Sequence, residues 1–442
     1  MEQHWVVMTV GLNPLPCLVE AHRLCCIVKE RTGRWPHFLV VRGRDYETRQ
    51  IFQYLVRKLE AATKGQVVLN HEEVHLQGDA VYDPKTIFDE ARNKIAARLA
   101  SATTIHFPYT GGTKAMSLHV YEALRASVSG EVILSYLGRA RHRLLSGSNQ
   151  FPADLGDERE EWNLSLDELA HLHAFKRVSP KTVDPKVEVL ASRMLTLMMQ
   201  GGYDGYWNWL GKEWKRAFRG SNEKDVYIEK LRSWPTVEVP WYGSGLPAWS
   251  DFSEDLASVP AFGASRVWQQ TNRGWNIRVD ASLKDFLIPL YRFFDNQSLE
   301  LYVYSKLREL LPEQYPVEHS IKFQETVSRK ECEIDIAAVL GYQLIGMSCT
   351  LSKDYGQCKR KGFEILHRAR QIGGDQALGT LVCLLDKRSA LDLERELTDD
   401  AETAFRVFHQ EMLSDVGGEE RLLREAFRAY LKQTKWSQFA GV

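Results

Sequence analysis

The sequence lacks the cysteine patterns of zinc sites and of disulfide-linked secreted domains. No C-x-x-C pair and no histidine spacing typical of zinc occurs among its seven cysteines, which are Cys17, Cys25, Cys26, Cys332, Cys349, Cys358 and Cys383. No charged, apolar, small-residue segment opens the chain, and its longest apolar runs fall short of the roughly 18 residues that a membrane span needs. We therefore expect reduced thiols, no membrane partner and a cytoplasmic protein.

An excess of charge of one sign is also missing. The 57 Lys and Arg residues are balanced by 58 Asp and Glu residues, so a polyanion would have to be held by a local basic patch. Composition therefore neither favours nor excludes a nucleic-acid partner. With 442 residues, of which 44% are hydrophobic and 26% charged, the chain is too long for one ordinary core and too apolar to be disordered. Two or three packed domains are expected.

The first part of the chain alternates short β-branched runs with helical stretches. The predicted strands are 5–12, 37–43, 67–70, 103–110 and 131–138, and the predicted helices lie near 16–30, 46–63, 84–101 and 112–127. This alternation predicts a parallel sheet covered by helices on both faces. The fold class is therefore α/β, with a Rossmann-like first domain over residues 1–151.

Residues 152–290 have a different texture. Helical segments rich in aromatic residues predict a helical middle region that links two other units. Its tryptophans Trp207, Trp209 and Trp214 could stack on bases, although at helical spacing such residues more often pack a core or a dimer interface.

A third unit, an α/β domain, is predicted over residues 291–442. Its elements are a helix, an extended stretch, an alternating segment, a long basic helix and a strand, at 299–310, 317–323, 331–350, 354–372 and 378–386. The alternation of apolar and polar residues around Gly341 predicts a β-hairpin with one buried face.

Two loops of the first unit carry residues suited to phosphate. Gly11-Leu12-Asn13-Pro14-Leu15-Pro16 follows the first predicted strand, and Tyr109-Thr110-Gly111-Gly112-Thr113-Lys114 follows the fourth. Consecutive glycines let backbone N–H groups point into one concavity, and a helix N-terminus, two hydroxyls and a lysine favour an anion there. The loops match neither the Walker A motif nor G-x-G-x-x-G, which argues against ATP hydrolysis and hydride transfer. The alternative is that Gly111-Gly112 only makes a tight turn.

The same loops, VGLNPLP and HFPYTGGTKAMSLHVYEAL (106–124), resemble the CRISPR-associated Rossmann-like (CARF) domain of type III CRISPR ancillary effectors. The resemblance covers roughly the first 150 residues. It implies that the domain dimerises and binds a cyclic oligoadenylate, commonly the cyclic tetra-adenylate, in a two-fold symmetric pocket. The matching ligand-binding positions are Asn13, Thr110, Gly111, Gly112, Thr113 and Lys114.

Acidic residues near the predicted hairpin suit a divalent metal. Metal-dependent phosphodiester cleavage needs carboxylates that converge on one or two cations, and a lysine near the attacking water. Glu300 lies on the predicted helix before the sheet, while Glu333 and Asp335 lie two residues apart on one strand and share a face. Acids on an apolar strand are costly without a partner, so a bound cation would explain them; a solvated strand edge is the alternative.

The order of these elements resembles the PD-(D/E)xK nuclease domain of the CARF-linked family that includes cyclic-oligoadenylate-activated DNA and RNA nucleases. The resemblance implies that Asp335 and Glu300 bind Mg²⁺ or Mn²⁺ and that the substrate is DNA or RNA. Where the family usually has E-C-K on the second strand, this chain has Ser348-Cys349-Thr350, so an acid and a lysine are missing. Loss of both would ordinarily abolish activity.

The helix after the hairpin offers replacements for the missing pair. Lys361 and Glu364 lie at i, i+3 on one face of that helix, and restriction-type folds tolerate migration of these groups. We predict that Lys361 and Glu364 act as catalytic residues with Asp335 and Glu333, and that Cys349 offers only its backbone carbonyl to the metal. The alternative is that this face holds nucleic-acid backbone or is a solvated helix surface.

The expected function is a homodimeric, ligand-activated, metal-dependent endonuclease of type III CRISPR antiviral defence. Three alternatives stay open: a catalytically degenerate nucleic-acid binder or regulator, a ring nuclease that uses Thr110 or Thr113, and a metal-free HEPN ribonuclease. The last rests on an R-x6-H match of Arg360 and His367 and needs an all-helical domain, so we interpret that match as accidental.

Overall fold

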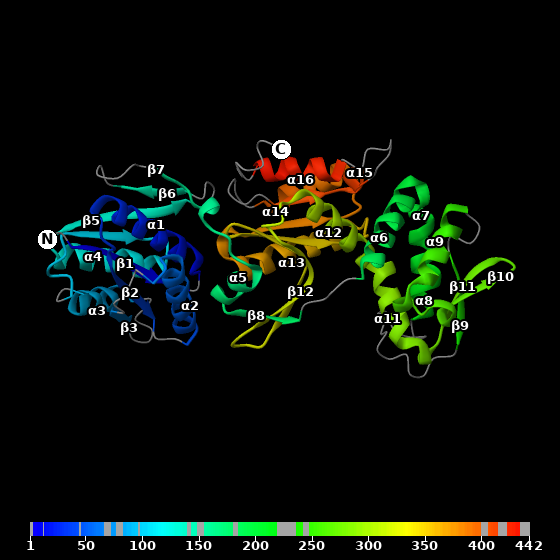
Figure 1. The fold of residues 1–442 in the computed structure, drawn as a ribbon, viewed down its shortest axis with the longest axis horizontal. Helices are drawn as coiled ribbons and strands as arrows, with labels where there is room; N and C mark the ends of the chain where they lie inside the picture. Colours follow the sequence, from blue (N-terminus) through cyan, green and yellow to red (C-terminus); the bar gives the residue numbers. More distant parts are fainter. Residues whose placement is uncertain are drawn as a thin grey trace.

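In the part of the chain that the structure describes, three β-sheets organise three units, one in each (Figure 1). A computed structural model describes residues 3–11, 13–43, 46–65, 72–76, 83–95, 98–138, 143–147, 154–179, 184–218, 236–241, 247–398, 405–413 and 422–433. The strand predicted at 67–70 lies outside these residues. No helix in the described ranges combines the length and the apolar character that crossing a bilayer requires.

The N-terminal unit is a Rossmann-like domain with strand order β3-β2-β1-β4-β5-β6-β7. Strands β1 to β5 pair in parallel, and β6 and β7 add an antiparallel edge. Its elements are β1 (His4–Val10), α1 (Leu15–Thr32), β2 (His37–Gly43), α2 (Tyr46–Ala62), β3 (Glu72–Leu76), α3 (Pro84–Ile95), β4 (Thr104–Pro108), α4 (Lys114–Ser127), β5 (Glu131–Gly138), β6 (Arg143–Ser146) and β7 (Asp154–Asp157).

Helices cover both faces of this sheet, as the strand–helix alternation predicts. Val6 and Met8 of β1 pack with α1 and α2, whereas Trp5 and Val7 pack with α3 and α4. Because side chains alternate along a strand, the continuous apolar run of β1 fills two cores at once.

The C-terminal unit is a six-stranded mixed sheet in the order β16-β15-β14-β13-β12-β8. The predicted hairpin is confirmed, because β13 and β14 pair antiparallel around the turn at Gly341. Its elements are α5 (Leu166–Leu172), β8 (Phe175–Ser179), α12 (Ser298–Leu310), β12 (Val317–Glu325), β13 (Glu331–Leu340), β14 (Gln343–Cys349), α13 (Tyr355–Gly373), η10 (Gly374–Gln376), β15 (Leu378–Val382), α14 (Lys387–Leu397), β16 (Arg406–Phe408), α15 (Gln410–Leu413) and α16 (Leu422–Gln433). Strand β8 comes from the middle of the sequence and pairs with β12.

The middle region is mostly helical and also carries a small sheet, β10-β11-β9. Three of its turns, η3, η4 and η9, are π-helical. Its elements are α6 (Pro185–Leu197), η3 (Met198–Gly202), α7 (Tyr203–Trp209), η4 (Leu210–Trp214), α8 (Lys215–Ala217), β9 (Val237–Pro240), α9 (Pro247–Ser258), η7 (Pro260–Phe262), α10 (Ala264–Val267), β10 (Trp268–Thr271), β11 (Gly274–Val279), η8 (Ala281–Leu283), α11 (Lys284–Arg292) and η9 (Phe293–Gln297).

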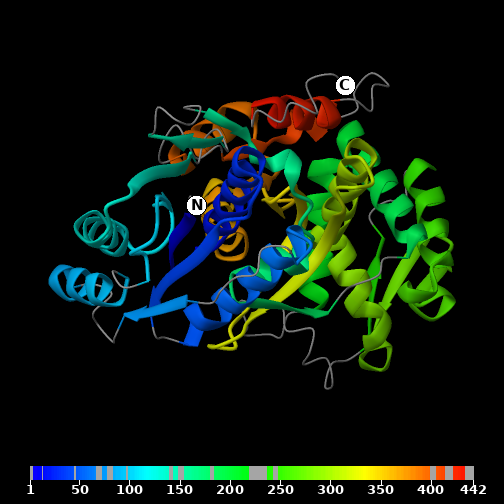
Figure 2. The same cartoon turned by 60° about the vertical axis from the view of Figure 1, so that its left-hand side comes forward.

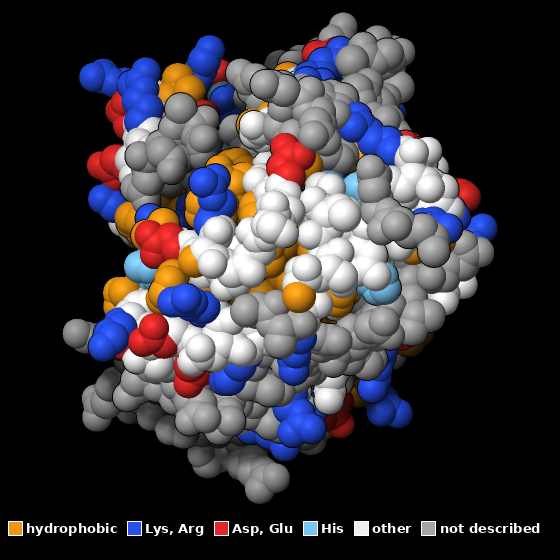
Figure 3. Space-filling view, turned by 90° about the vertical axis from the view of Figure 1, so that its left-hand side faces the viewer, with side chains coloured by type: hydrophobic (Ala, Val, Ile, Leu, Met, Phe, Trp, Pro, Cys, Tyr) orange, Lys and Arg blue, Asp and Glu red, His pale blue; other side chains and the backbone are white. Residues whose placement is uncertain are grey.

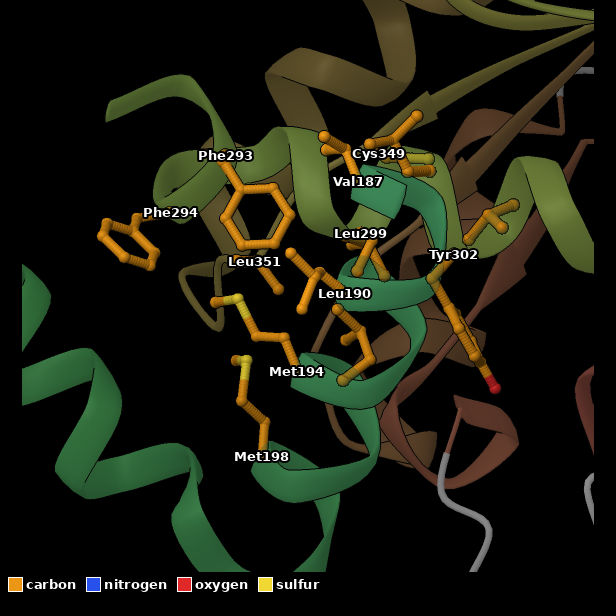
Figure 4. Packing of buried hydrophobic residues seen from close by; sticks show 14 of the residues in the cluster. Val187, Leu190, Met194, Met198, Phe293, Phe294, Leu299, Tyr302, Cys349 and Leu351 are labelled. Carbon is orange, nitrogen blue, oxygen red and sulfur yellow. The ribbon is translucent and has the colours of Figure 1, made fainter. Parts of the chain in front are cut away.

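The order of the units in space differs from their order along the chain. In Figures 1 and 2 the C-terminal sheet, yellow to red, lies between the blue N-terminal unit and the green helices α6 to α11. One face of that sheet shares a hydrophobic core with α1 and α2. The other face shares a core with α6, α12 and the tryptophan-bearing helices α7 and α9. Figure 4 shows Val187, Leu190 and Met194 of α6 packed near Leu299 of α12 and Cys349 at the end of β14. The C-terminal unit therefore contacts both of the others.

Candidate functional site

The glycine loop lies where β4 ends and α4 begins. Thr113 caps the helix, since its side chain accepts a hydrogen bond from the Met116 N–H at 3.1 Å, and Lys114 is the first helical residue. The N-terminus of a helix carries N–H groups without helical partners and the positive end of the helix dipole, so it stabilises an anion. The predicted residues Thr110 to Lys114 thus lie together at one helix N-terminus.

Close backbone packing explains the two glycines. A Cβ atom on Gly111 would lie 2.2 Å from Cys17 Sγ and 2.3 Å from the Thr9 carbonyl oxygen. Gly112 has φ +72°, which L side chains rarely adopt. The hydroxyls of Thr9 and Ser117 each donate to the Gly111 carbonyl at 2.7 Å. The loop is therefore fixed in one conformation against β1.

A buried acid lies directly behind this loop. The Thr110 hydroxyl donates to Glu20 Oε1 at 2.6 Å and accepts from the Leu137 N–H at 3.0 Å. Glu20 has no exposed surface, and burial raises the pKa of its carboxyl from the usual 4.5 to about 8. At neutral pH this carboxyl is mostly protonated, so the loop does not set a full negative charge against an incoming phosphate.

A cavity of about 430 Å³ opens beside the loop. Thr110, Gly112 and Lys114 line it on the polar side, and the remaining wall is apolar and aromatic, made of Phe107, Tyr109, Leu118, Tyr121 and Leu134 together with Ser117. Aromatic rings beside an amine and hydroxyls are the chemistry that binds a nucleotide's base and phosphate.

Asn13 points to a different partner. Its side-chain N–H₂ donates to Asp375 Oδ2 at 3.1 Å, and its Oδ1 lies 3.4 Å from His173 Nε2. Burial lowers the pKa of His173 to about 4, so that ring is neutral at pH 7. A Cβ atom on Gly374 would lie 2.5 Å from Asn13 Oδ1. The loop after β1 therefore contacts the end of α13 in the C-terminal unit, and Asn13 does not line the cavity.

A second site lies at the end of the β13–β14 hairpin. Asp335 Oδ2 accepts hydrogen bonds from the Ser348 hydroxyl and the Cys349 N–H, both at 2.8 Å. Burial raises the pKa of Asp335, and these bonds and the charge of Lys361 oppose the rise. Glu300, Asp335 and Lys361 all lie close enough to shift the pKa of Cys349, although burial is the largest cause of its rise. Charged groups from α12, β13 and α13 therefore act on the end of the same hairpin strand.

The other two predicted acids have protein partners nearby. Glu333 Oε1 accepts from the Ser320 hydroxyl at 2.9 Å, and its charge raises the pKa of Asp335 further. Glu364 forms an ion pair with Arg368, whose guanidinium also donates to the Glu333 carbonyl at 2.5 Å. Glu333 thus lies beside Asp335, whereas the contact of Glu364 is with Arg368.

The second strand of the hairpin carries no charged group at the site. Ser348 bonds to Asp335, the side chain of Cys349 is buried in the core near α12, and Thr350 is 2% exposed with its N–H donating to the Val382 carbonyl at 2.9 Å. Burial raises the pKa of the Cys349 thiol well above its ordinary value. The hairpin sequence therefore supports the geometry of Asp335.

Asp335 and Glu300 are the two carboxylates predicted to bind a metal. Among the described residues no group of three or more His, Cys, Asp and Glu side chains could hold a metal ion. Mg²⁺ and similar ions commonly bind through one or two carboxylates, with water and substrate phosphates completing the coordination. A buried carboxyl whose pKa is raised gains most from a nearby cation, so the pair fits Mg²⁺ or Mn²⁺ held jointly with a substrate.

Sequence reasoning missed three residues that shape these sites: Glu20, His173 and Asp375. The burial of Glu20 could have been predicted from the sequence. Apolar Pro16 and Leu24 lie four residues before and after it, which places this acid on the helix face that packs inward. His173 and Asp375 left no such signal, since they meet Asn13 from more than 150 residues away. The HEPN alternative is wrong for Arg360 and His367, because their helix packs on a six-stranded sheet.

The charge pattern on the surface is mixed. Figure 3 views the N-terminal unit from the end opposite the C-terminal unit, and the described Lys and Arg side chains alternate there with Asp and Glu. This agrees with the balanced composition of the chain.

Comparisons with known proteins place this fold. No protein-family model matches the sequence, and no curated protein does. The chain is similar in structure to protein VC1899 from Vibrio cholerae, with a TM-score of 0.58, 13% identity and coverage of 97% of this chain and 98% of that one. It is also similar to Can2 from Sulfobacillus thermosulfidooxidans, solved in complex with cyclic tetra-adenylate, with a TM-score of 0.53, 13% identity and coverage of 91% and 92%. The predicted fold class is confirmed by this likeness over nearly the whole chain.

Proposed function

We propose that this chain is a sensor nuclease of type III CRISPR defence, in which cyclic oligoadenylate bound to the N-terminal CARF-like domain activates metal-dependent cleavage in the C-terminal unit. The observation that carries the proposal is the largely buried Asp335 carboxyl, which accepts hydrogen bonds from Ser348 and Cys349 and lies within electrostatic reach of Lys361. Can2, which shares the fold, binds cyclic tetra-adenylate. Its ligand supports our choice of cyclic oligoadenylate as the signal.

The glycine loop and its cavity carry the ligand-binding step. Phosphate would lie at the N-terminus of α4, against Thr110 to Lys114, and an adenine would lie along the aromatic wall of the cavity. The protonated Glu20 behind Thr110 lowers the electrostatic cost of bringing a polyanion to the loop. A second copy of the chain would complete a two-fold pocket for a cyclic ligand.

The C-terminal site carries the cleavage step. Asp335 and Glu300 would hold a divalent cation, Mg²⁺ or Mn²⁺, which supplies Lewis-acid stabilisation of the phosphate when bound. The Ser348 hydroxyl and the Cys349 N–H hold Asp335 in place. Lys361 would stabilise the negative charge that develops on the phosphate and orient the attacking water. Glu333 and Glu364 remain candidates for a proton-accepting role.

The contact at Asn13 offers a route between the two sites. The loop after β1 packs against the glycine loop, since a Cβ on Gly11 would lie 3.1 Å from Gly112 Cα. Two residues later, Asn13 bonds to Asp375, which follows the end of α13, and α13 also carries Lys361. Suppose that these loops have two arrangements and that each places α13 differently. A ligand that binds one arrangement more tightly shifts the equilibrium toward it, by an amount set by the difference in affinity.

A second function is favoured by the hairpin sequence itself. Ser348-Cys349-Thr350 supplies neither an acid nor a lysine, and the described residues contain no cluster of three metal-binding side chains. A degenerate nuclease would bind the ligand and nucleic acid without cutting. A ring-nuclease activity of Thr110 or Thr113 would instead consume the ligand.

Ligand binding and cutting are tested separately to distinguish these functions. Calorimetry with cyclic tetra-adenylate on the native chain and on Lys114→Ala is expected to give tight binding that the variant loses. Chromatography of the ligand after incubation reports ring-nuclease activity. Ligand-dependent cleavage of plasmid DNA or single-stranded RNA in Mn²⁺ supports the nuclease, and ligand and nucleic-acid binding with no cleavage establishes the degenerate regulator.

A further inference from the structure

One of three neighbouring tryptophans is exposed. Trp209 and Trp214 are core residues with 6% and 0% exposure. Trp207, which lies on the short helix α7 together with Trp209, is 36% exposed. Helix α7 lies between the π-helical turns η3 and η4, and such turns are rare and recur at functional sites. The fold of the middle region therefore explains two of the tryptophans and leaves Trp207 without a role in packing the core.

Trp207 is linked to the loop that follows the candidate nuclease strand. Its ring stacks on Tyr203 at 6.0 Å between ring centroids, and the Tyr203 hydroxyl donates to the Leu351 carbonyl at 2.9 Å. Leu351 comes two residues after Cys349, whose N–H holds Asp335. A short series of direct contacts therefore joins the exposed ring to the site that would cut.

Two lysines lie over the same pair of rings. Lys353 Nζ is 3.9 Å from the Tyr203 ring centroid and 3.0 Å from Asp204, and Lys215 Nζ is 5.8 Å from the Trp207 ring centroid. Lys353 is exposed and belongs to the loop between β14 and α13. Both ammonium groups already have carboxylate partners, Asp204 for Lys353 and Asp295 for Lys215, so the exposed indole is the group that can stack on a base.

We propose that Trp207 and Tyr203 form a stacking platform, with Trp207 its exposed ring, for an unpaired base of the nucleic acid strand that is cut. The proposal rests on the nuclease function proposed above and adds a subsite to it. The base must be unpaired because a duplex covers the face of each base with its neighbours. Stacking is tolerant of sequence, so the platform selects the single-stranded state and not a particular base.

The test measures binding without cutting. Fluorescence anisotropy follows a labelled single-stranded oligonucleotide, its duplex form and a strand without bases, each titrated with the full chain in metal-free buffer at one salt concentration. Trp207→Ala is expected to weaken single-strand binding by about 5- to 150-fold and to leave duplex and abasic binding unchanged. Trp207→Phe keeps an aromatic face and should retain most of the affinity. Leu391→Ala, at a similarly exposed position on α14, is the matched control.

The outcomes separate this proposal from the function on which it rests. Equal single-strand affinity of the native chain and Trp207→Ala overturns the platform alone. An equal loss for single strand and duplex also overturns it, and an altered oligomeric state of Trp207→Ala shows that the ring belongs to an interface between copies. If the native chain binds cyclic tetra-adenylate but no nucleic acid, the nuclease function and the platform both fail.

Discussion

The buried acid behind the glycine loop predicts a specific pH dependence of stability. Glu20 is fully buried with a pKa raised to about 8, chiefly by desolvation, and it faces the Thr110 hydroxyl, the Leu137 N–H and the Cys17 thiol. In the unfolded chain its pKa returns to about 4.5. The folded state therefore holds a proton that the unfolded state releases between these two values, so stability falls as pH rises through this window.

The size of the effect follows from the two pKa values. Each pKa unit corresponds to about 1.4 kcal/mol, so the contribution of Glu20 to the free energy of unfolding should fall by about 3.5 kcal/mol from pH 5 to pH 8. Glu20→Gln keeps the shape and removes the titration. Burying the amide costs the same free energy at every pH. It therefore shifts the whole stability curve of Glu20→Gln by a constant and does not change the difference in slope from the native curve.

Urea denaturation at a series of pH values measures this difference. The gap in unfolding free energy between Glu20→Gln and the native chain should grow in favour of the variant by about 3.5 kcal/mol between pH 5 and pH 8, then level off. Glu30→Gln, an exposed position on the same helix, should follow the native curve. Parallel curves for Glu20→Gln and the native chain would refute the reasoning, because they would mean that Glu20 ionises near its ordinary pKa in the folded state.

Three further predictions follow from the two sites. Lys361→Ala should lower the initial rate of ligand-activated cleavage by about 100-fold or more while calorimetry shows unchanged ligand affinity, because the lysine belongs to the C-terminal site and not to the glycine loop. Asn13→Ala removes a partly exposed bond to Asp375 and should lower the ratio of ligand-stimulated to basal cleavage by about fivefold; Asp375→Ala should do the same, with no further loss in the double variant. Gly111→Ala should lower the free energy of unfolding by about 2 kcal/mol or more in urea and abolish ligand binding, since its Cβ would overlap Cys17 Sγ and the Thr9 carbonyl.

The sequence was sufficient to predict most of the fold, because its elements have strong local signals. The β-branched runs of β1, β2 and β4 are each followed by a helix, and the alternation around Gly341 predicted the hairpin that the structure contains. The spatial order of the units left no such signal. Nothing in the spacing of residues 175–179 indicates that they pair with β12, because strand pairing depends on the whole sheet.

Asp335 and Lys361 lie on neighbouring elements that the sequence also indicated. Because they are close in sequence, the hairpin and the helix after it bring the charge of Lys361 within reach of Asp335. The hydrogen bond from Ser348 to Asp335 was not foreseen. A serine in place of an expected acid indicates only a missing metal ligand until the register of β13 and β14 is known. Asn13 was predicted to bind the ligand on family likeness, and its contact with Asp375 emerges only from the packing of two units.

The measurement that tests the central claim most directly is a cleavage time course with the native chain and Asp335→Ala. Labelled single-stranded and duplex DNA and RNA are incubated with Mn²⁺, with cyclic tetra-adenylate, with both and with neither. The account predicts cutting only when both are present and none by Asp335→Ala, which should still bind the ligand. Cutting that persists in Asp335→Ala, or that is unaffected by the ligand, would contradict it.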